Sequence, residues 1–416
     1  MMTEKLNALL GWIDERFPLT ATWKSQLAEY YAPKNFNFWY YFGSLALLVL
    51  VMQIVTGIFL TMHYKPDASL AFGSVEYIMR DVPWGWLIRY MHSVGASMFF
   101  VVVYLHMFRG MLYGSYRKPR ELLWIFGMLI YLCLMAEAFF GYLLPWGQMS
   151  FWGAQVIVNL FDAIPVIGPD LALWIRGDYA ISDATLNRFF AFHVIAVPLL
   201  LLGLVAAHVI ALHEVGSNNP DGIEIKKHKD PKTGIPLDGI PFHPYYTVKD
   251  MVGVMAFLIV FSIIVFFIPE MGGYFLEQNN FIPADSLRTP VHIAPLWFFT
   301  PFYSILRANT FNFFWIPGKL WGVLFMALAV LIYFFLPWLD RSPVKSIRYR
   351  GPIYKTALTL FVINFLILGY LGTKPVDPVR TVVAQITTVI YFLFFILMPW
   401  YTKLDKTRAE PERVRW

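Results

Sequence analysis

Charged residues and cysteine are both scarce in this sequence. Asp, Glu, Lys and Arg make up 14% of the 416 residues, against about 25% in a typical soluble domain. Cys133 is the only cysteine, so the chain can form neither an internal disulfide nor an iron–sulfur cluster held by four of its own thiolates. No Cys-Xaa-Xaa-Cys-His motif occurs, which excludes a covalently attached c-type haem.

Apolar residues are correspondingly abundant, at 58% of the chain, with 18% aromatic. A soluble core of this length could not bury so much apolar surface, whereas a lipid bilayer can. We therefore expect an all-α, polytopic membrane protein in which eight segments cross about 30 Å of hydrocarbon. The predicted spans are Phe38–Met62, Tyr90–Phe108, Leu122–Tyr142, Phe189–Leu212, Met251–Ile268, Leu320–Leu339, Thr356–Thr373 and Thr381–Thr402.

Basic residues are concentrated in alternate connecting segments. The N-terminal arm, the second, fourth and sixth loops and the C-terminal tail contain 23 of the 33 Lys and Arg residues. By the positive-inside rule, both termini then face the cytoplasm, here called the negative side. The net charge of +6 reflects this distribution, and we expect no nucleic-acid partner.

Two loops on the opposite, positive side contain apolar pieces that do not span. Residues Gln148–Ala163 lie between Pro145 and Pro165 and suit a helix at the membrane interface. Residues Thr289–Ile305 contain three prolines and cannot form one continuous helix. Irregular apolar backbone is tolerated where it lines a cavity, so we expect these loops to form the walls of a pocket. With no internal repeat or flexible linker, residues 1–416 are predicted to form a single membrane domain.

Four histidines lie well inside predicted spans. His92 and His106 are 14 residues apart in the second span, and His193 and His208 are 15 apart in the fourth. Both spacings return to nearly the same helix face, about 21–23 Å along the axis. Because both spans run in the same direction, His92 is level with His193 (the outer pair) and His106 with His208 (the inner pair). This pattern is typical of two six-coordinate haems stacked across the membrane, although a lone membrane histidine is often only a helix–helix hydrogen-bonding group.

Glycines repeat at the same interval. Gly43 and Gly57 in the first span, and Gly127 and Gly141 in the third, are each 14 residues apart. Glycine lets another body approach the backbone closely, so we predict that these residues face haem edges. The alternative is packing between small residues of neighbouring helices.

Two arginines flank the histidines of the second span. Arg89 precedes the outer pair and Arg109 follows the inner pair. Either is placed to bind haem propionates, or alternatively to extend its guanidinium to the membrane interface. The predicted architecture is therefore a di-haem four-helix bundle formed by the first four spans.

Four strings of residues strongly resemble the cytochrome b subunit of the respiratory cytochrome bc complexes, in its proteobacterial form. They are Gly141–Gly153 (GYLLPWGQMSFWG), Arg188–His193 (RFFAFH), His213–Pro220 (HEVGSNNP) and Tyr246–Asp250 (YTVKD). The resemblance covers nearly the whole chain. It implies a di-haem half, residues 38–212, and a C-terminal half, residues 213–416, that completes two quinone pockets.

The resemblance implies quinol–cytochrome c reductase activity by a proton-translocating Q cycle in a bacterial inner membrane. The implied cofactors are a low-potential haem b on the outer histidines and a high-potential haem b on the inner ones, with ubiquinone as substrate. The implied partners are a Rieske iron–sulfur protein, cytochrome c1, the lipid bilayer and a second copy of the complex.

Two sets of quinone-site residues carry over from the resemblance. The positive-side, quinol-oxidising pocket is implied to use Phe139, Tyr142, Gly153, Pro295, Trp297 and Tyr303. The negative-side, quinone-reducing pocket is implied to use Ser44, His213, Ser217, Lys249 and Asp250. His213 and Asp250 flank one loop and can supply protons to a reduced quinone, or they can simply be interfacial residues that face water.

The sequence departs from the family pattern at two places. The histidine spacing of 15 in the fourth span exceeds the mitochondrial spacing of 14, which leaves the ring orientation open. The segment Pro295–Phe298 reads PLWF, with Leu296 where the family has a glutamate that is generally assigned as the proton acceptor from quinol. We expect Glu137, in the third span, or Glu270, at the end of the fifth, to substitute. The alternatives are a structurally paired carboxylate for Glu137 and a solvated helix-end charge for Glu270.

Two other functions remain open from the residues alone. Ferric-reductase-type membrane proteins also place paired histidines on two helices, but no Gly-Xaa-Gly-Xaa-Xaa-Gly nucleotide-binding motif follows here. A cofactor-free transporter predicts discontinuous spans and a midplane substrate site, and it leaves the four histidines unexplained.

Overall fold

The computed structural model describes residues 2–312, 314–315 and 317–415. It contains eight helical segments that are long and apolar enough to cross a membrane. They are Phe38–Thr61, Gly85–Tyr113, Glu121–Leu143, Asp183–Val215, Phe242–Phe267, Gly318–Leu339, Pro352–Gly372 and Pro378–Ile396. The predicted all-α, eight-span fold is confirmed, and each predicted span overlaps one of these segments.

Several spans are single helices and others join consecutive helices. The spanning elements are α3 (Tyr41–Thr61), α5 (Gly85–Tyr113), α6 (Glu121–Leu143), α9 (Asp183–Ala191) with η3 (Phe192–Ala196) and α10 (Val197–Val215), α11 (Thr247–Phe267), α13 (Gly318–Leu331) with η8 (Ile332–Phe335) and α14 (Leu336–Leu339), α15 (Pro352–Gly372) and α16 (Pro378–Ile396). The shorter helices are α1 (Met2–Asp14), α2 (Leu19–Trp23), α4 (Ala71–Arg80), α7 (Gln148–Phe161), α8 (Gly168–Arg176), α12 (Thr300–Arg307) and α17 (Met398–Leu404). Single helical turns are η1 (Lys24–Ala28), η2 (Phe38–Tyr40), η4 (Ile225–Lys227), η5 (Phe242–Tyr246), η6 (Met271–Gly273) and η7 (Gln278–Phe281).

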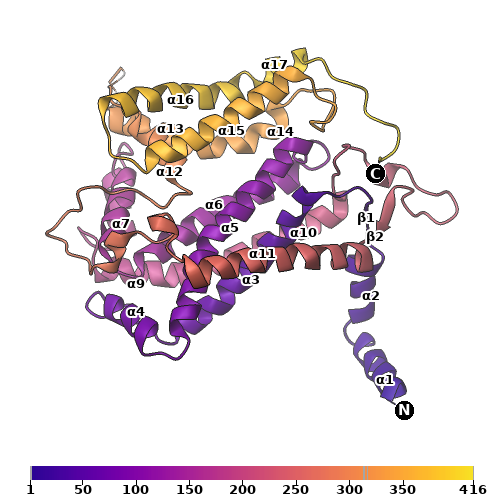
Figure 1. Ribbon diagram of the computed structural model, residues 1–416, viewed down its shortest axis with the longest axis horizontal. Coiled ribbons are helices and arrows are strands. Elements are labelled where there is room, and N and C mark those ends of the chain that lie inside the picture. The colour runs from indigo at the N-terminus through magenta and orange to yellow at the C-terminus, as the bar shows by residue number, and fades with distance from the viewer. Residues whose placement is uncertain (1, 313, 316, 416) are drawn as a thin grey trace.

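The spans form two packed groups (Figure 1). In the first, α3 packs along α5, and α10 packs along α6. In the second, α12 contacts α13 and α15, and α15 packs on α16. A single apolar cluster with members as far apart as Phe42 and Met398 joins the groups, so the histidine-bearing helices are braced by the C-terminal half.

The two non-spanning loops fold as expected. Residues Gln148–Phe161 form the separate helix α7. In the second loop, helix begins only at Thr300, with Pro301 in the first turn of α12, where its missing N–H removes no hydrogen bond. The preceding residues 289–299 are irregular and reach the pocket described below.

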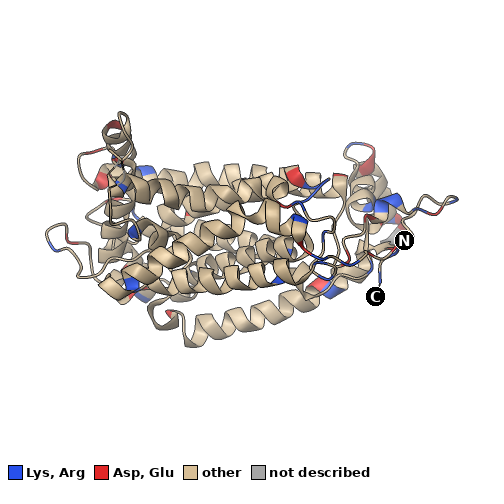
Figure 2. Cartoon of the chain, turned by 90° about the horizontal axis from the view of Figure 1, so that it is seen from above, with Lys and Arg blue, Asp and Glu red and all other residues tan. Residues whose placement is uncertain are grey.

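Both termini lie at one end of the molecule, together with many of the Lys and Arg residues (Figures 1 and 2). There β1 (Tyr31–Pro33) pairs antiparallel with β2 (Gly239–Pro241). The side chain of Asp238 is fully buried between Lys34, at 3.1 Å, and Arg413, at 2.6 Å. Burial opposes the charge on Asp238, but the hydrogen bonds from Arg413 and Lys34 outweigh it and lower its pKa to about 2. The N-terminal arm, the fourth loop and the tail, all predicted to share one side, are thus joined.

Candidate functional site

The four spanning histidines form two facing pairs. The ring centroids of His92 and His193 are 6.1 Å apart, and those of His106 and His208 are 6.4 Å apart. Two imidazoles that bind one metal ion from opposite sides, with metal–nitrogen bonds of about 2.0 Å, have centroids about 6.3 Å apart. Both pairs therefore fit bis-imidazole ligation of an iron.

Each predicted glycine lies against one of these imidazoles. A Cβ atom added at Gly43, Gly57 or Gly127 would lie 3.3 Å from the Cε1 atom of His106, His92 or His208, respectively. A Cβ atom at Gly141 would lie only 2.4 Å from Cε1 of His193. The 14-residue glycine interval thus matches the histidine interval because each glycine makes room for a ring. That the same residues face haem edges stays a prediction.

A π-helical turn explains the 15-residue spacing. The turn η3 covers Phe192–Ala196 and includes His193. A π turn holds one more residue than an α turn, so the extra residue is absorbed and His208 returns to the face of His193. The spacing that left the ring orientation open is therefore compatible with two level pairs. Pro198 follows directly, in the first turn of α10.

The outer imidazoles are hydrogen-bonded through their Nδ1 atoms. Nδ1 of His92 lies 2.9 Å from the hydroxyl of Thr56, which itself donates to the carbonyl of Met52. Nδ1 of His193 lies 3.0 Å from both the carbonyl and the Oε1 atom of Glu137. Partners of this kind hold a ring in the tautomer that leaves Nε2 free to bind a metal.

The inner pair has different neighbours. Nη2 of Arg109 lies 3.4 Å from Nδ1 of His106, and its guanidinium lies over the ring of Tyr40. Among the described residues, no carboxylate lies within ion-pair distance of His106 or His208. The carboxylate contact is thus a property of the outer pair.

A cavity of about 270 Å³ surrounds the outer pair. Its walls include His92, His193, Gly57, Gly141 and the predicted propionate ligand Arg89. The wall nearest the irregular loop is formed in part by Tyr142 and Leu296. Those two side chains also line a second, smaller pocket.

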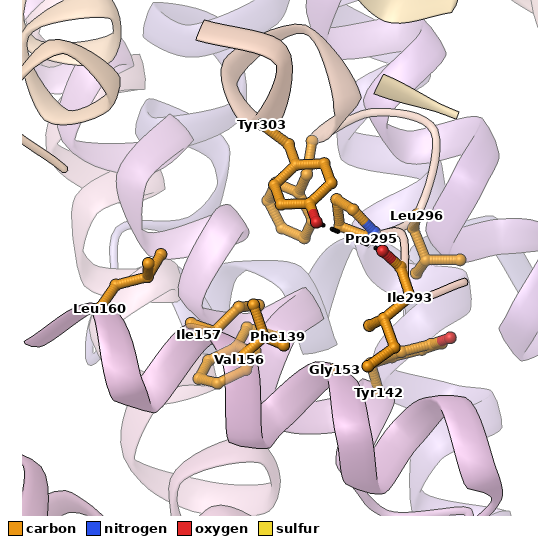
Figure 3. Close-up of a pocket in the computed structure, with 11 residues that line it drawn as sticks. Phe139, Tyr142, Gly153, Val156, Ile157, Leu160, Ile293, Pro295, Leu296 and Tyr303 are labelled. Atoms are coloured by element: carbon orange, nitrogen blue, oxygen red, sulfur yellow. Dashed lines mark hydrogen bonds between the residues drawn. The ribbon is translucent and has the colours of Figure 1, made fainter. Parts of the chain in front are cut away.

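The smaller pocket, of about 40 Å³, lies between α6, α7 and the loop before α12 (Figure 3). It is lined by Phe139, Tyr142, Gly153, Val156, Ile157, Leu160, Ile293, Pro295, Leu296, Phe299 and Tyr303. Five of the six residues predicted for the quinol-oxidising pocket are among them. The sixth, Trp297, lies outside this lining, and its indole donates to Ser97 on α5 at 3.2 Å.

Neither carboxylate predicted to replace the missing glutamate lines the smaller pocket. Glu137 contacts His193 instead, and Glu270 is partly exposed at the end of α11. A third carboxylate, which sequence reasoning missed, lies closer: Glu277 accepts a hydrogen bond from the Tyr142 hydroxyl. No local sequence pattern distinguishes Glu277 from the other two acidic residues of the loop, Glu270 and Asp285.

The predicted negative-side residues form two clusters. In one, Tyr30 stacks on His213 with centroids 4.3 Å apart, and its hydroxyl lies 3.1 Å from that of Ser217. In the other, Asp250 interacts with the hydroxyl of Ser44. Lys249, beside Asp250, donates to the carbonyl of Phe36 at 2.6 Å.

Comparisons with known proteins agree with this arrangement. A family model described as cytochrome b/b6/petB matches residues 27–216, and one described as cytochrome b (C-terminal)/b6/petD matches residues 283–392. The chain is 64% identical to cytochrome b of Allochromatium vinosum over 99% of this chain and 100% of that protein. It is 48% identical to cytochrome b of Rickettsia bellii over 99% and 98%, respectively. It is also similar to a chain of the solved structure "Hyperthermophilic respiratory Complex III", with a TM-score of 0.85, 40% identity, and coverage of 94% and 98%.

Proposed function

The chain belongs to the cytochrome b/b6 family and is a respiratory electron-transfer subunit of the complex III type, and on this premise we propose the reaction that it performs. It oxidises quinol at the positive-side pocket and reduces quinone at the negative-side pocket, with two bound b haems between them and with proton translocation by a Q cycle. The observation that carries this proposal is the pair of imidazole–imidazole separations, 6.1 and 6.4 Å, at two levels of the same two helices.

The chain's own residues are arranged to hold two haems. His92 and His193 would bind the low-potential haem, and His106 and His208 the high-potential haem. When bound, each haem would supply an iron that accepts and passes on one electron at a time. Gly57 and Gly43 keep the backbone of α3 clear of the imidazoles.

The smaller pocket has the features of a quinol site. Its lining is apolar, which suits a quinone ring, and the hydroxyls of Tyr142 and Tyr303 supply polar contacts. Tyr142 and Leu296 separate it from the cavity of the outer histidines by a single layer of side chains. A quinol bound there would lie next to the low-potential haem.

The negative-side site would use the two clusters near the termini. His213 and Asp250 are placed to donate protons as quinone is reduced, with Ser44, Ser217 and Lys249 orienting the ring. The termini would lie in the cytoplasm of a bacterial cell, because the basic segments cluster at that end. The substrate would be ubiquinone, and the electron-accepting partners a Rieske iron–sulfur protein and cytochrome c1 within a dimeric complex.

A redox titration of the purified complex tests this proposal. We expect a reduced-minus-oxidised spectrum with two b-type components of distinct midpoint potential, and cytochrome c reduction that depends on added quinol. A colourless protein would contradict it and favour a transporter. Two b haems without quinol-dependent cytochrome c reduction would instead favour another di-haem reductase.

A further inference from the structure

The smaller pocket offers no acid–base group of its own beyond tyrosine. Its eleven lining residues contain no Asp, Glu, His, Lys or Arg. Position 296, which faces both the pocket and the outer cavity, is a leucine. If the pocket oxidises quinol, as proposed above, the titratable side chains on its wall that could pass on a proton are Tyr142 and Tyr303.

The two hydroxyls lead to different acceptors. Tyr303 donates to the main-chain carbonyl of Ile293 at 3.3 Å (Figure 3), and an amide carbonyl does not take up a proton near neutral pH. Tyr142 donates instead to the carboxylate of Glu277. A carboxylate, unlike an amide carbonyl, can take up a proton near neutral pH when its pKa is raised.

We propose that Glu277, reached through the Tyr142 hydroxyl, is the proton acceptor for quinol oxidation in this chain and takes the role that Leu296 cannot perform. The inference rests on the proposed function, because it assumes that quinol occupies the smaller pocket. Tyr142 lines that pocket, would touch the substrate and is the relay. Glu277 does not line the pocket and accepts the proton through Tyr142.

The proton transfer balances without a charged tyrosine. As one electron passes from the quinol to the iron–sulfur partner, the quinol O–H bond breaks and its proton bonds to the Tyr142 oxygen. The Tyr142 O–H bond breaks in the same step, and that proton bonds to Oε2 of Glu277. Tyr142 is regenerated neutral, and Glu277 becomes a neutral carboxylic acid.

The surroundings of Glu277 suit an acceptor that must release its proton again. Burial raises its pKa to about 7, against the opposing effect of the Tyr142 hydrogen bond. The adjoining helices α7 and η7 contain no titratable residue, and the other titratable residues of its own loop are Glu270, Tyr274, Asp285, Arg288 and His292. Glu277 itself is only partly buried, and the next residues, Gln278 and Asn279, are exposed. A proton on Glu277 therefore has a short path to water at the positive side.

The test compares three variants of the complete complex with the wild type. Glu277→Gln keeps a hydrogen-bond acceptor for Tyr142 and removes the basic group. Tyr142→Phe removes the link. We expect each to slow quinol oxidation about tenfold or more, within the range of general acid–base effects. Asp285→Asn changes an exposed carboxylate of the same loop and is expected to leave the rate unchanged.

The pH profile separates proton acceptance from a structural role. Glu277 accepts a proton only when ionised, so the wild-type rate should fall as the pH drops through about 7. Glu277→Gln should lose that limb of the profile. Placing Glu at position 296 in the Glu277→Gln background should restore both rate and limb, because it returns a carboxylate to the pocket wall.

The outcomes distinguish this inference from the proposed function. Haem spectra of each variant establish that the two b haems are bound. If Glu277→Gln and Tyr142→Phe both retain the wild-type rate and profile, the relay is wrong while the proposed function stands. If the wild type itself binds no haem or does not oxidise quinol, the proposed function fails first.

Discussion

The outer and inner histidine pairs have nearly equal ring separations but different second contacts. The outer rings bond through Nδ1 to the Thr56 hydroxyl and to Glu137. The inner pair instead has the guanidinium of Arg109 against His106. A carboxylate beside a ligating imidazole makes it a stronger donor and favours the oxidised metal, whereas a nearby cation disfavours that state. If each pair binds a haem, as proposed, this contrast predicts a lower midpoint potential at the outer level.

Replacing one histidine of a pair should give the largest difference in haem content between the two levels. His193→Leu is expected to abolish haem binding by the outer pair and leave the inner haem in place, and His208→Leu should do the reverse. Haem content and the reduced-minus-oxidised spectrum measure this directly. Loss of both haems from either variant would show that the levels are not independent.

Replacing glycine by alanine should impair haem binding more at Gly141, beside the outer pair, than at Gly127, beside the inner pair. Gly141→Ala places a Cβ atom 2.4 Å from the His193 ring, whereas Gly127→Ala places one 3.3 Å from His208. Overpacking of this kind typically costs about 1–3 kcal/mol, so Gly141→Ala should reduce outer-haem occupancy or raise thermal sensitivity. Gly127→Ala, on the same helix, is the matched control. Equal effects of Gly141→Ala and Gly127→Ala would contradict the expectation that the closer contact is the more damaging one.

Glu137→Gln should shift one potential and not the other. Loss of the carboxylate beside His193 is expected to raise the midpoint of the outer haem by tens of millivolts. The inner haem serves as the internal control in the same potentiometric titration. An unchanged outer midpoint would assign Glu137 a purely structural role.

Thr56→Val should give the smallest effect. It removes the hydroxyl 2.9 Å from Nδ1 of His92 and retains the branched shape of the side chain. A neutral hydrogen bond polarises the ring less than a carboxylate does, so the outer midpoint should rise by less than in Glu137→Gln. If the outer midpoint shifted more in Thr56→Val than in Glu137→Gln, the Thr56 hydroxyl and not the Glu137 carboxylate would be the contact that dominates the potential.

The sequence predicted the helices and the histidine levels because both depend on local regularities. Hydropathy over about 20 residues defines a span, and intervals of 14 and 15 residues define a helix face. The eight spans are confirmed on that basis. The roles of the four histidines and four glycines stay predictions that the geometry supports.

The acidic residues were harder to predict because neighbours in sequence are not neighbours on a helix. Glu137 is only two residues from Phe139, which lines the smaller pocket, yet that step turns the helix by about 200°. Glu137 shares a face with Gly141, four residues on, and so points toward His193. The contact of Glu277 with Tyr142 spans 135 positions and depends on how the loop before α12 packs, which no local pattern records.

The π turn at Phe192–Ala196 also bears on how this membrane helix tolerates changes in length. One residue gained or lost there alters the count between the two histidines without sliding the C-terminal half of the helix past its neighbours. Related chains that differ in the number of residues between these two histidines can therefore still superimpose with their imidazole rings in the same positions. Alignments of such chains should be anchored on the imidazoles, with the gap placed inside the turn.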